Sequence, residues 1–438
     1  MERSKSLEGE KSRWLGVVII WWMWMDNALA RAEILGRRWQ EWIHQPSAEM
    51  EPLIEAQVSQ SGHTRADIVF QLKHLAEAIN VETLQAWVRQ SWPQGVRTSS
   101  EMIEPEYFES GEYPSSLVCC VHAGNIPMVG LQDMLAICLA GGFYAGKLSR
   151  RDASLMQSWL DYLRHTEPDL GQQLAWSTDA AALVQSLDRP IEAWIFTGNE
   201  STWETIQGQF GVNTGQGESQ TTTLVRRAEA SVAMLEDQQA ALQSSELKAL
   251  AESMLLYQGK GCRSVGIIVS AQPLSFYQHS CAMVDSMEAV IIESRQDKSP
   301  VSEERVMERG WCAAHQIPHI WVDHLLIREA PHYLNEPNES LFSTIPGVIY
   351  WVQGDASMVE QWLDDPRKAA QIQSIYAVNP RDYASGGSEK SVKSLPNLGI
   401  EAEIEALEHA QRPPIDWTPD GQNPLAWVLN LSIESRES

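Results

Sequence analysis

Short apolar runs alternate with helical stretches between residues 117 and 227, and this alternation constrains the fold more than any other feature of the sequence. The apolar runs include SLVCCVHAG from residue 116, Phe143–Leu148 and Ala193–Thr197, and the helical stretches include GLQDMLAICLAGG from residue 130 and Ala153–His165. Neighbouring parallel strands need a crossover connection, which is usually a helix. The alternation therefore predicts a parallel α/β sheet that is covered by helices on both faces.

Further elements are expected on both sides of this region. From about Asp26 to Trp92, apolar residues recur at three- and four-residue steps, which predicts an α-rich N-terminal region. A second α/β region continues through Ile317–Val322 and a helix at Met358–Leu363. Near the C-terminus the pattern predicts an acidic helix around Glu401–Ala410 among Pro and Gly turns.

The charge balance excludes general binding to nucleic acid. Lys and Arg number 33 and Asp and Glu number 58, which gives a formal net charge of −25 over 438 residues. Such acidity disfavours contact with nucleic acid or with anionic lipid. A ligand that carries phosphate must therefore meet a local basic pocket.

The 6 cysteines are sparse for this length, and most of them lie in or beside apolar runs. This is typical of reduced thiols and predicts a cytoplasmic protein. Residues 1–25 form an N-terminal extension whose apolar run, residues 14–25, is too short to span a bilayer, so no stable membrane span is expected. The run could be a signal peptide, because Ala28-Leu29-Ala30 gives a cleavage pattern; the alternative is a translation start at Met23 or Met25.

One cysteine has the surroundings of a nucleophile. Cys262 stands in Gly259-Lys260-Gly261-Cys262-Arg263, after a predicted helix and before a predicted strand. Glycines permit close backbone approach, and neighbouring cations lower the pKa of a thiol towards that of a reactive thiolate. The competing interpretation is a small buried residue in the core.

Three other segments each end a predicted strand and open a predicted helix. They are His122–Pro127, Gly146–Asp152 and Phe196–Ser201. In doubly wound sheets, ligands bind at the carboxyl ends of strands, where free N–H groups of helix N-termini point outwards. Taken singly, each segment could be only a helix cap.

Together, the order and spacing of these segments resemble the LuxC-type acyl-CoA reductases of the aldehyde dehydrogenase superfamily, over roughly residues 110–380. The resemblance implies that Asn125 supplies an oxyanion-hole amide and that Lys147 binds the cofactor ribose. It implies that Phe196, Thr197 and Gly198 approach the nicotinamide nucleotide.

The stretch that ends in Gly-Lys-Gly-Cys-Arg is similar to the nucleophile segment of that family, which implies that Cys262 is the catalytic cysteine. The implied fold is α/β and aldehyde dehydrogenase-like, with two doubly wound domains and a cleft between them. Residues 26–245 would form the α-rich N-terminal region and the cofactor-binding domain, residues 246–390 the catalytic domain, and residues 391–438 a C-terminal segment.

One position differs from the pattern of hydrolytic aldehyde dehydrogenases. Those enzymes carry a general-base Glu at the start of one segment, and the matching segment of this sequence starts with Arg226. No water-activating carboxylate matches that point, although Glu229 is near enough in sequence to leave the assignment open. A thioester reductase needs no such base, because hydride and not water discharges its acyl-cysteine.

The resemblance implies an enzyme that reduces a fatty acyl thioester, either acyl-CoA or an acyl-carrier thioester, to the aldehyde. NADPH is the expected cofactor, because Arg150 or Arg151 could read a 2′-phosphate, and NADH is the alternative. A homo-oligomer is expected. Two other functions stay open: a CoA-acylating aldehyde dehydrogenase that runs in the reverse direction, and a cysteine acyltransferase or thioesterase without nicotinamide.

No metal is expected. Cys312, His315, His319 and His324 are of metal-ligand types, but Pro318 interrupts any helix that would align them, and the surrounding residues have the pattern of a buried strand. Gly141 and Gly146-Lys147 resemble the opening of a phosphate-binding P-loop, but Leu148 stands where that loop needs Ser or Thr.

Overall fold

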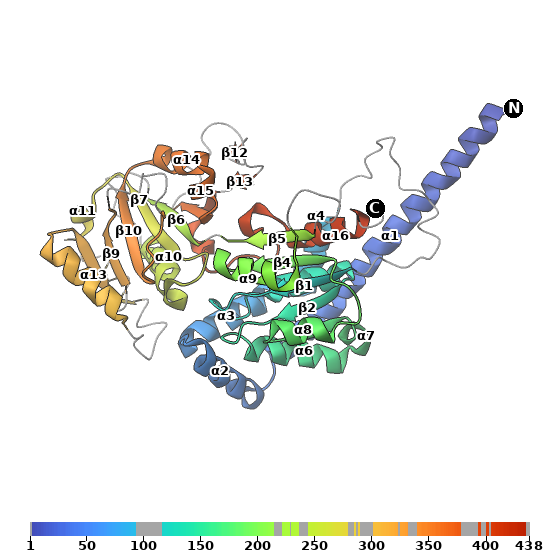
Figure 1. Cartoon of the computed structure of the whole chain (residues 1–438), viewed down its shortest axis with the longest axis horizontal. Coiled ribbons are helices and arrows are strands. Elements are labelled where there is room, and N and C mark those ends of the chain that lie inside the picture. Colours follow the sequence, from blue (N-terminus) through green and yellow to red (C-terminus); the bar gives the residue numbers. More distant parts are fainter. Residues whose placement is uncertain are drawn as a thin grey trace.

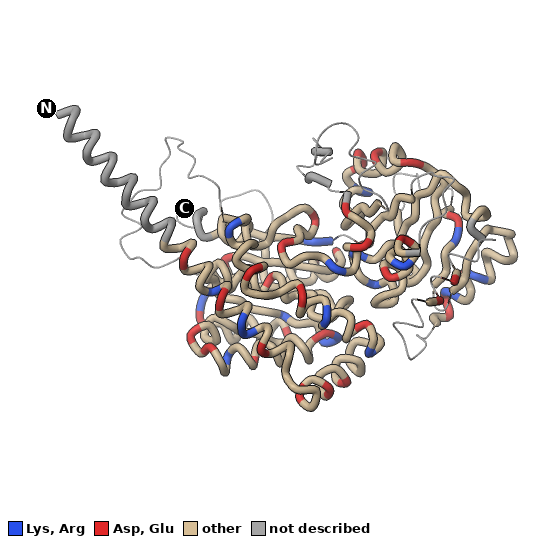
Figure 2. Tube along the Cα trace, turned by 180° about the vertical axis from the view of Figure 1, so that it is seen from behind, with Lys and Arg blue, Asp and Glu red and all other residues tan. Residues whose placement is uncertain are grey.

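The structure is a computed structural model, and it describes residues 2–92, 116–213, 221–227, 229–235, 244–278, 284–285, 288–289, 301–322, 325–331, 340–377, 393–395, 400–402 and 404–434. Its two main sheets lie in separate halves of the molecule (Figure 1). Asp and Glu are distributed over both halves and do not gather in a single patch (Figure 2). Among the described residues, none of the helices combines the length and the apolar character that crossing a bilayer requires.

The N-terminal region is helical, as predicted. It consists of α1 (Glu2–Ile43), α2 (Ser47–Ser61), α3 (Arg65–Ala78) and α4 (Val81–Ser91). Capping boxes formed by Thr64 with Asp67 and by Asn80 with Thr83 start α3 and α4. Gly36 lets α1 cross α4 closely, because a Cβ at this position would lie 2.6 Å from the backbone nitrogen of Val81.

The first sheet is the predicted parallel one. It consists of β1 (Leu117–Val121), β2 (Phe143–Lys147), β3 (Leu174–Ser177), β4 (Ala193–Thr197) and β5 (Thr222–Arg226), in the order β3-β2-β1-β4-β5. One face packs on α5 (Leu131–Ala140), α6 (Ser154–Thr166) and the N-terminal helices, and the other on α8 (Ala180–Ser186) and α9 (Glu200–Phe210). The strand order reverses direction between β1 and β4, which is where open α/β sheets form their binding crevice.

The second sheet is larger. Its order is β14-β11-β6-β7-β10-β9-β8, with strands β6 (Ala230–Leu235), β7 (Val265–Ser270), β8 (His319–Val322), β9 (Leu325–Glu329), β10 (Val348–Gln353), β11 (Ile372–Ala377) and β14 (Ile404–Ala406). All neighbouring pairs are parallel except β8 and β9. One face packs on α10 (Ser244–Leu255) and the other on α14 (Ala356–Asp364).

The chain passes from the first sheet to the second between Arg226 and Ala230, ahead of the domain boundary predicted at residue 245. The division into domains stays a prediction. The remaining described elements are α7 (Pro168–Gly171), α11 (Leu274–Gln278), α13 (Glu303–Ala314), α15 (Pro366–Ala369), and the two-stranded sheet of β12 (Lys393–Leu395) and β13 (Ile400–Ala402).

The acidic helix predicted at Glu401–Ala410 is wrong. Ile404 pairs with Ile375 of β11, so the segment forms the edge strand β14 and then a 3₁₀ turn, η5 (Leu407–His409). Beyond η5 the chain runs back over the first half and ends in α16 (Pro424–Glu434), which packs on α5 (Figure 1). Gln132 of α5 donates to the carbonyl oxygens of Ile415 and Trp417, both at 2.7 Å. This C-terminal segment, residues 404–434, therefore joins the two halves.

Candidate active site

Cys262 lies in a turn between a strained 3₁₀ segment and strand β7. The 3₁₀ segment, η2 (Leu256–Gly259), follows α10 and holds Tyr257, Gln258 and Gly259 at φ values of 55°, 59° and 67°. The left-handed region suits glycine but costs about 1 to 3 kcal/mol for other residues. Two such residues in succession persist only where the surrounding structure fixes them.

The N-terminal helices provide the contacts that fix this segment. The backbone N–H of Tyr257 donates to Asp67 Oδ1 at 3.2 Å, and its hydroxyl donates to Gln71 Oε1 at 2.6 Å. Gln258 Nε2 donates to the carbonyl oxygen of Gly62 at 2.8 Å. The corner between α2 and α3 thus holds the loop that carries the cysteine.

Asn125, which follows β1, meets the same loop from the first sheet. Its Nδ2 donates to the carbonyl oxygen of Lys260 at 3.0 Å. The next residue, Ile126, packs against Gly261 so closely that a Cβ on the glycine would lie 3.0 Å from Ile126 Cδ1. The structure therefore brings the predicted oxyanion residue to the loop of the predicted nucleophile, and one of the two amide N–H groups is used to hold that loop.

The thiol of Cys262 is half-buried, and its pKa moves opposite to the sequence-based expectation. Burial, and then the charge of Asp420, raise the pKa of Cys262 to about 11, although Arg263 and Arg226 lower it. The expectation failed because the cost of burying the thiolate outweighs the effect of Arg263, which also has other partners. Its Nε donates to the carbonyl oxygen of Ala410 at 2.8 Å, and its Nη2 pairs with Glu405 at 2.9 Å.

The predicted cofactor residues gather at the carboxyl edge of the first sheet. Val121 of β1 is in register with Lys147 of β2 on one side and with Phe196 of β4 on the other, so the three strand ends lie side by side. Thr197 continues β4, and the backbone N–H of Gly198 donates to Arg226 O at 3.2 Å. These residues flank the point where the strand order reverses.

The individual side chains differ in how accessible they are. Lys147 is half-buried, and burial and then Arg150 lower its pKa. The guanidinium groups of Arg150 and Arg151 are less constrained, because both side chains are exposed. Phe196 is fully buried against Trp203, with 5.0 Å between ring centroids, so only its backbone faces the edge of the sheet.

Arg226 occupies the end of β5, in register with Thr197. It is 6% exposed, and its Nη1 donates to Asp133 of α5 at 2.8 and 3.0 Å to the two carboxylate oxygens. Glu229 lies at the start of β6, where its backbone N–H donates to the carbonyl oxygen of Gln371. The charge of Asp420 raises the pKa of Cys262, and the assignment of Glu229 stays open.

The sequence analysis missed Asp133, Asp420 and Asp67. Asp133 did leave a signal, because it is the only charged residue in the apolar helix LQDMLAICLA. Asp420 stands in a Pro-Asp-Gly turn and Asp67 in a capping box, and both patterns have an ordinary structural explanation. Only the tertiary contacts separate these two residues from other turn and cap residues.

The candidate metal residues serve the local structure. Cys312 is buried in α13, and ring nitrogens of His315 and His319 face the carbonyl oxygens of Trp311 and Ile317. His324 lies outside the described residues. Within the described part of the chain, no group of three or more His, Cys, Asp or Glu side chains could hold a metal ion.

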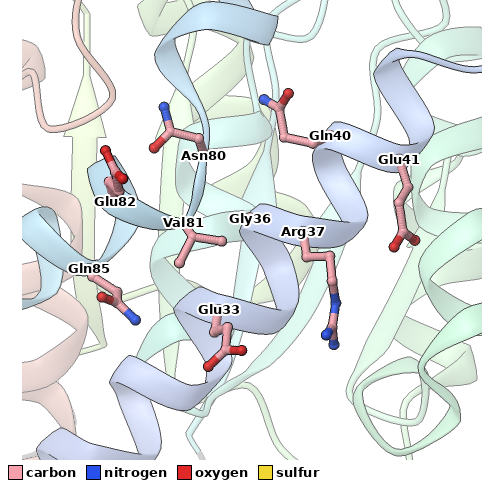
Figure 3. A pocket seen from close by; sticks show the side chains of 9 residues that line it. All are labelled: Glu33, Gly36, Arg37, Gln40, Glu41, Asn80, Val81, Glu82 and Gln85. Carbon is pink, nitrogen blue, oxygen red and sulfur yellow. The ribbon is translucent and has the colours of Figure 1, made fainter.

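A hollow of about 940 Å³ opens between α1 and the start of α4 (Figure 3). Glu33, Arg37 and Gln40 of α1 line one side, and Asn80 and Glu82 line the other. None of Cys262, Asn125 and Lys147 lines it. The hollow is a feature of the helical region and is separate from the cysteine loop.

Comparison with solved structures identifies the fold. A glyceraldehyde-3-phosphate dehydrogenase from Methanocaldococcus jannaschii, solved with NADP, matches with a TM-score of 0.56 and 10% identity, over 94% of this chain and 92% of that one. Aldehyde dehydrogenase 21 from Physcomitrella patens, solved with succinate, matches with a TM-score of 0.57 and 10% identity, over 93% and 88%. The chain has the aldehyde dehydrogenase fold.

A third solved structure with the aldehyde dehydrogenase fold is the gamma-glutamyl-gamma-aminobutyraldehyde dehydrogenase of Burkholderia cenocepacia, with a TM-score of 0.53, 11% identity and coverage of 82% and 73%. No family model matches the sequence, and no curated protein matches it. The predicted α/β architecture with two sheets is therefore confirmed at the level of the fold.

Proposed function

We propose that this chain is an NAD(P)H-dependent reductase of the LuxC type, which converts a fatty acyl thioester, acyl-CoA above all, to the aldehyde. The observation that carries the proposal is the hydrogen bond from Asn125 Nδ2 to Lys260 O, inside an aldehyde dehydrogenase fold. This bond joins the carboxyl edge of the first sheet to the loop of Cys262. An amide and a thiol at one junction are the two groups that acyl transfer to cysteine requires.

The residues at the sheet edge fit a nicotinamide dinucleotide. The donor set combines the ammonium of Lys147, the hydroxyl of Thr197, and the exposed guanidinium groups of Arg150 and Arg151. Such donors match ribose hydroxyl and phosphate oxygens, and they supply local positive charge in a chain of net charge −25. Lys147, Thr197, Gly198 and the backbone of Phe196 would hold the dinucleotide, and Arg150 or Arg151 would favour NADPH.

The protein groups act mainly in the capture of the acyl group. The thiolate of Cys262 attacks the thioester carbonyl carbon, the carbon–sulfur bond to CoA breaks, and CoA leaves as a thiolate. The second N–H of Asn125 and the backbone N–H of Cys262 stabilise the oxyanion that forms in between. When bound, the reduced nicotinamide supplies the hydride that turns the acyl-cysteine into a thiohemiacetal, whose collapse releases the aldehyde and the thiolate.

Arg226 supports reduction over hydrolysis. It stands where hydrolytic relatives of this fold would carry a general base, and a guanidinium does not lose its proton in proteins. Its bond to Asp133 holds it in place. Water near the acyl-cysteine therefore finds no base at this position.

Intact-mass analysis tests the proposal. The chain is incubated with long-chain acyl-CoA, with and without NADPH, and Cys262→Ala serves as the control. We expect an acyl adduct on Cys262 that disappears only when NADPH is added, with aldehyde and NADP⁺ formed in equal amounts. An adduct that decays without NADPH would indicate a thioesterase, and a chain that forms no adduct would contradict the proposal.

A further inference from the structure

Asp152 is a buried carboxyl group at the end of the segment Gly146–Asp152, and it holds the turn that carries Asn125. Its Oδ2 accepts the backbone N–H of Met128, three residues after Asn125, at 2.9 Å. Both partners are buried, Asp152 with 6% and Met128 with 2% of its surface exposed. A buried N–H that loses such an acceptor is left without a partner, which is costly. The bond therefore fixes the end of the Asn125 turn.

Met128 needs this support because its backbone is strained. It stands at φ 59°, in the left-handed region, which is unfavourable for a residue other than glycine. Such a conformation persists only where surrounding contacts fix it. The carbonyl oxygen of Met128 accepts the backbone N–H of Leu131, the first residue of α5, at 3.0 Å. Met128 thus joins the Asn125 turn to α5, while Asp152 holds its N–H.

The other end of the Asn125 turn packs on the same segment. Gly124 lies so close to Ser149 that a Cβ on the glycine would be 2.8 Å from Ser149 Cβ. Ser149 and Asp152 belong to one turn, in which the backbone N–H of Asp152 donates to Ser149 O at 3.0 Å. One turn therefore contacts the residue before Asn125 and the residue three positions after it.

Helix α2 anchors the turn that Ser149 and Asp152 form. Gln57 of α2 is fully buried, and its Nε2 donates to Asp152 Oδ1 at 2.8 Å and to the carbonyl oxygen of Arg151 at 3.3 Å. Side chains that are supported from a helix are held more precisely than side chains on a free loop. Gln57 thus gives Asp152 a fixed position.

The same helix also reaches the loop of Cys262. Gly62, the C-cap residue of α2, accepts from Gln258 Nε2 at 2.8 Å, four residues ahead of the cysteine. One helix therefore supports the cysteine loop from its end and, through Asp152, the Asn125 turn from its interior. An oxyanion donor must lie within about 0.5 Å of its productive position, so the placement of these two loops controls what the donor contributes.

We infer that Asp152 is a positioning residue for Asn125, and that Gln57 holds Asp152 in that role. Asp152 acts through the backbone N–H of Met128, which fixes the amide of Asn125 relative to the sulfur of Cys262. The inference rests on the proposed function, in which the second N–H of Asn125 stabilises the oxyanion. It extends the residues that determine the acylation rate to a helix outside both sheets.

Two reactions of Cys262 separate positioning of Asn125 from general support of the site. Acylation by long-chain acyl-CoA, followed by intact mass without NADPH, passes through an oxyanion and depends on its donors. Alkylation by iodoacetamide, located by peptide mapping, displaces iodide without forming an oxyanion, so its rate reports on access to the thiol and on its ionisation. Both rates are measured in the full chain for wild type, Asp152→Ala, Asn125→Ala and the double variant.

Asp355→Ala is the control for the kind of bond that is lost. The Asp355 carboxylate accepts the backbone N–H of Ser357 at 2.9 Å at the start of α14, which packs on the second sheet. This variant also loses a carboxyl group and its bond to a backbone N–H, but it leaves the contacts of the Asn125 turn in place. Both of its rates should equal those of wild type.

We expect acylation to be about 10- to 100-fold slower in Asp152→Ala, with alkylation within about twofold of wild type. In the double variant, acylation should stay within about twofold of Asn125→Ala, because Asp152 acts through Asn125. Gln57→Met keeps the volume of the side chain and removes the donor, and it should slow acylation alone by about 3- to 10-fold. This variant decides the test if Asp152→Ala does not fold.

Three results would overturn the inference and leave the proposed function standing. They are acylation of Asp152→Ala at the wild-type rate, acylation and alkylation rates that fall together, and a double variant that is slower than Asn125→Ala by the full effect of Asp152→Ala. An Asn125→Ala variant that acylates as fast as wild type would overturn the inference together with the proposed role of Asn125. A wild-type chain that forms no acyl adduct would overturn both the inference and the proposed function.

Discussion

The carboxylate of Asp67 accepts the backbone N–H of Tyr257 at 3.2 Å, and so joins a helix of the N-terminal region to the strained turn before Cys262. The hydroxyl of the same tyrosine bonds to Gln71 on that helix. The helical region is thus part of the support of the candidate active site. Its effect on Cys262 should be measurable separately from its effect on stability.

Tyr257→Phe removes the bond to Gln71 and leaves the ring in place. We expect a loss of about 1 kcal/mol in the free energy of unfolding, and slower acylation of Cys262 because the turn is less firmly held. Tyr162→Phe is the control, because the Tyr162 hydroxyl donates to Glu41 at 3.0 Å away from the cysteine loop. Urea unfolding and acylation rates measure the two effects. Equal acylation rates in both variants would contradict a positioning role for Tyr257.

Asn125→Ala removes the predicted oxyanion donor and the bond to Lys260 O. We expect kcat to fall by about 10² to 10³-fold, the usual loss for one such donor. Asn80→Ala is the control, since it removes a helix cap at a cost of about 1 kcal/mol but should leave kcat unchanged. Steady-state aldehyde production measures both. An Asn125→Ala enzyme with wild-type kcat would exclude the amide from the reaction.

Arg150→Ala and Arg151→Ala test the choice of cofactor. If either guanidinium binds a 2′-phosphate, its removal should weaken NADPH binding by about tenfold or more and leave NADH binding unchanged, because NADH lacks this phosphate. Calorimetric titration of both nucleotides gives the two affinities. Arg65→Ala, on the surface of α3, provides the matched loss of one cation. Parallel losses of NADPH and NADH affinity would argue against recognition of the 2′-phosphate.

The buried carboxyl group of Asp152 should make the free energy of unfolding depend on pH. It ends the segment Gly146–Asp152 and accepts from Met128 N at 2.9 Å and from Gln57 Nε2 at 2.8 Å. Burial raises its pKa to about 8, whereas an unfolded chain has an Asp pKa of about 3.9. Between these values the folded state holds a proton that the unfolded state has lost. The contribution of Asp152 to stability therefore falls as pH rises towards 8, by at most about 1.4 kcal/mol per pH unit.

Urea unfolding at pH 6, 7 and 8 measures this dependence. We expect Asp152→Asn to flatten it, because Asn does not titrate. Asp161→Asn on the exposed face of α6 should keep the wild-type slope. The same slope in Asp152→Asn as in wild type would show that another group is responsible.

The buried pair of Arg226 and Asp133 can be tested with a double-mutant cycle. Asp133→Leu alone leaves a buried guanidinium without its carboxylate and should cost about 3 to 5 kcal/mol in unfolding free energy. Arg226→Met with Asp133→Leu replaces both charges by apolar groups and should recover a large part of that loss. Denaturant unfolding of the single and double variants gives the coupling energy. An additive result would contradict the pairing.

The sequence predicted those parts of the fold and site that depend on local patterns. The strand Ala193–Thr197 coincides with β4, and the strands that lead to Asn125, Lys147 and Thr197 do end at one edge of the sheet. Alternating apolar runs identify buried parallel strands, and the carboxyl ends of such strands necessarily lie together. The roles of these side chains in catalysis and cofactor binding stay predictions.

The features that the sequence did not predict depend on contacts between segments that are far apart in the chain. Glu405 was predicted to lie in a helix, but Ile404 next to it pairs with β11, and Glu405 then binds Arg263. The pKa of the neighbouring thiol lies above its ordinary value because burial outweighs the effect of Arg263. Asp420 and Asp67 became visible as site residues only once distant segments were brought together.

The C-terminal segment also determines at what point of translation the contacts around the candidate active site can form. Cys262 is synthesised well before Asp420, and Gln132 and Arg263 cannot engage Trp417 until that residue has left the exit tunnel. Until then, Arg263 lacks Glu405, Ala410 and Trp417, the partners that hold it beside Cys262 in the folded protein.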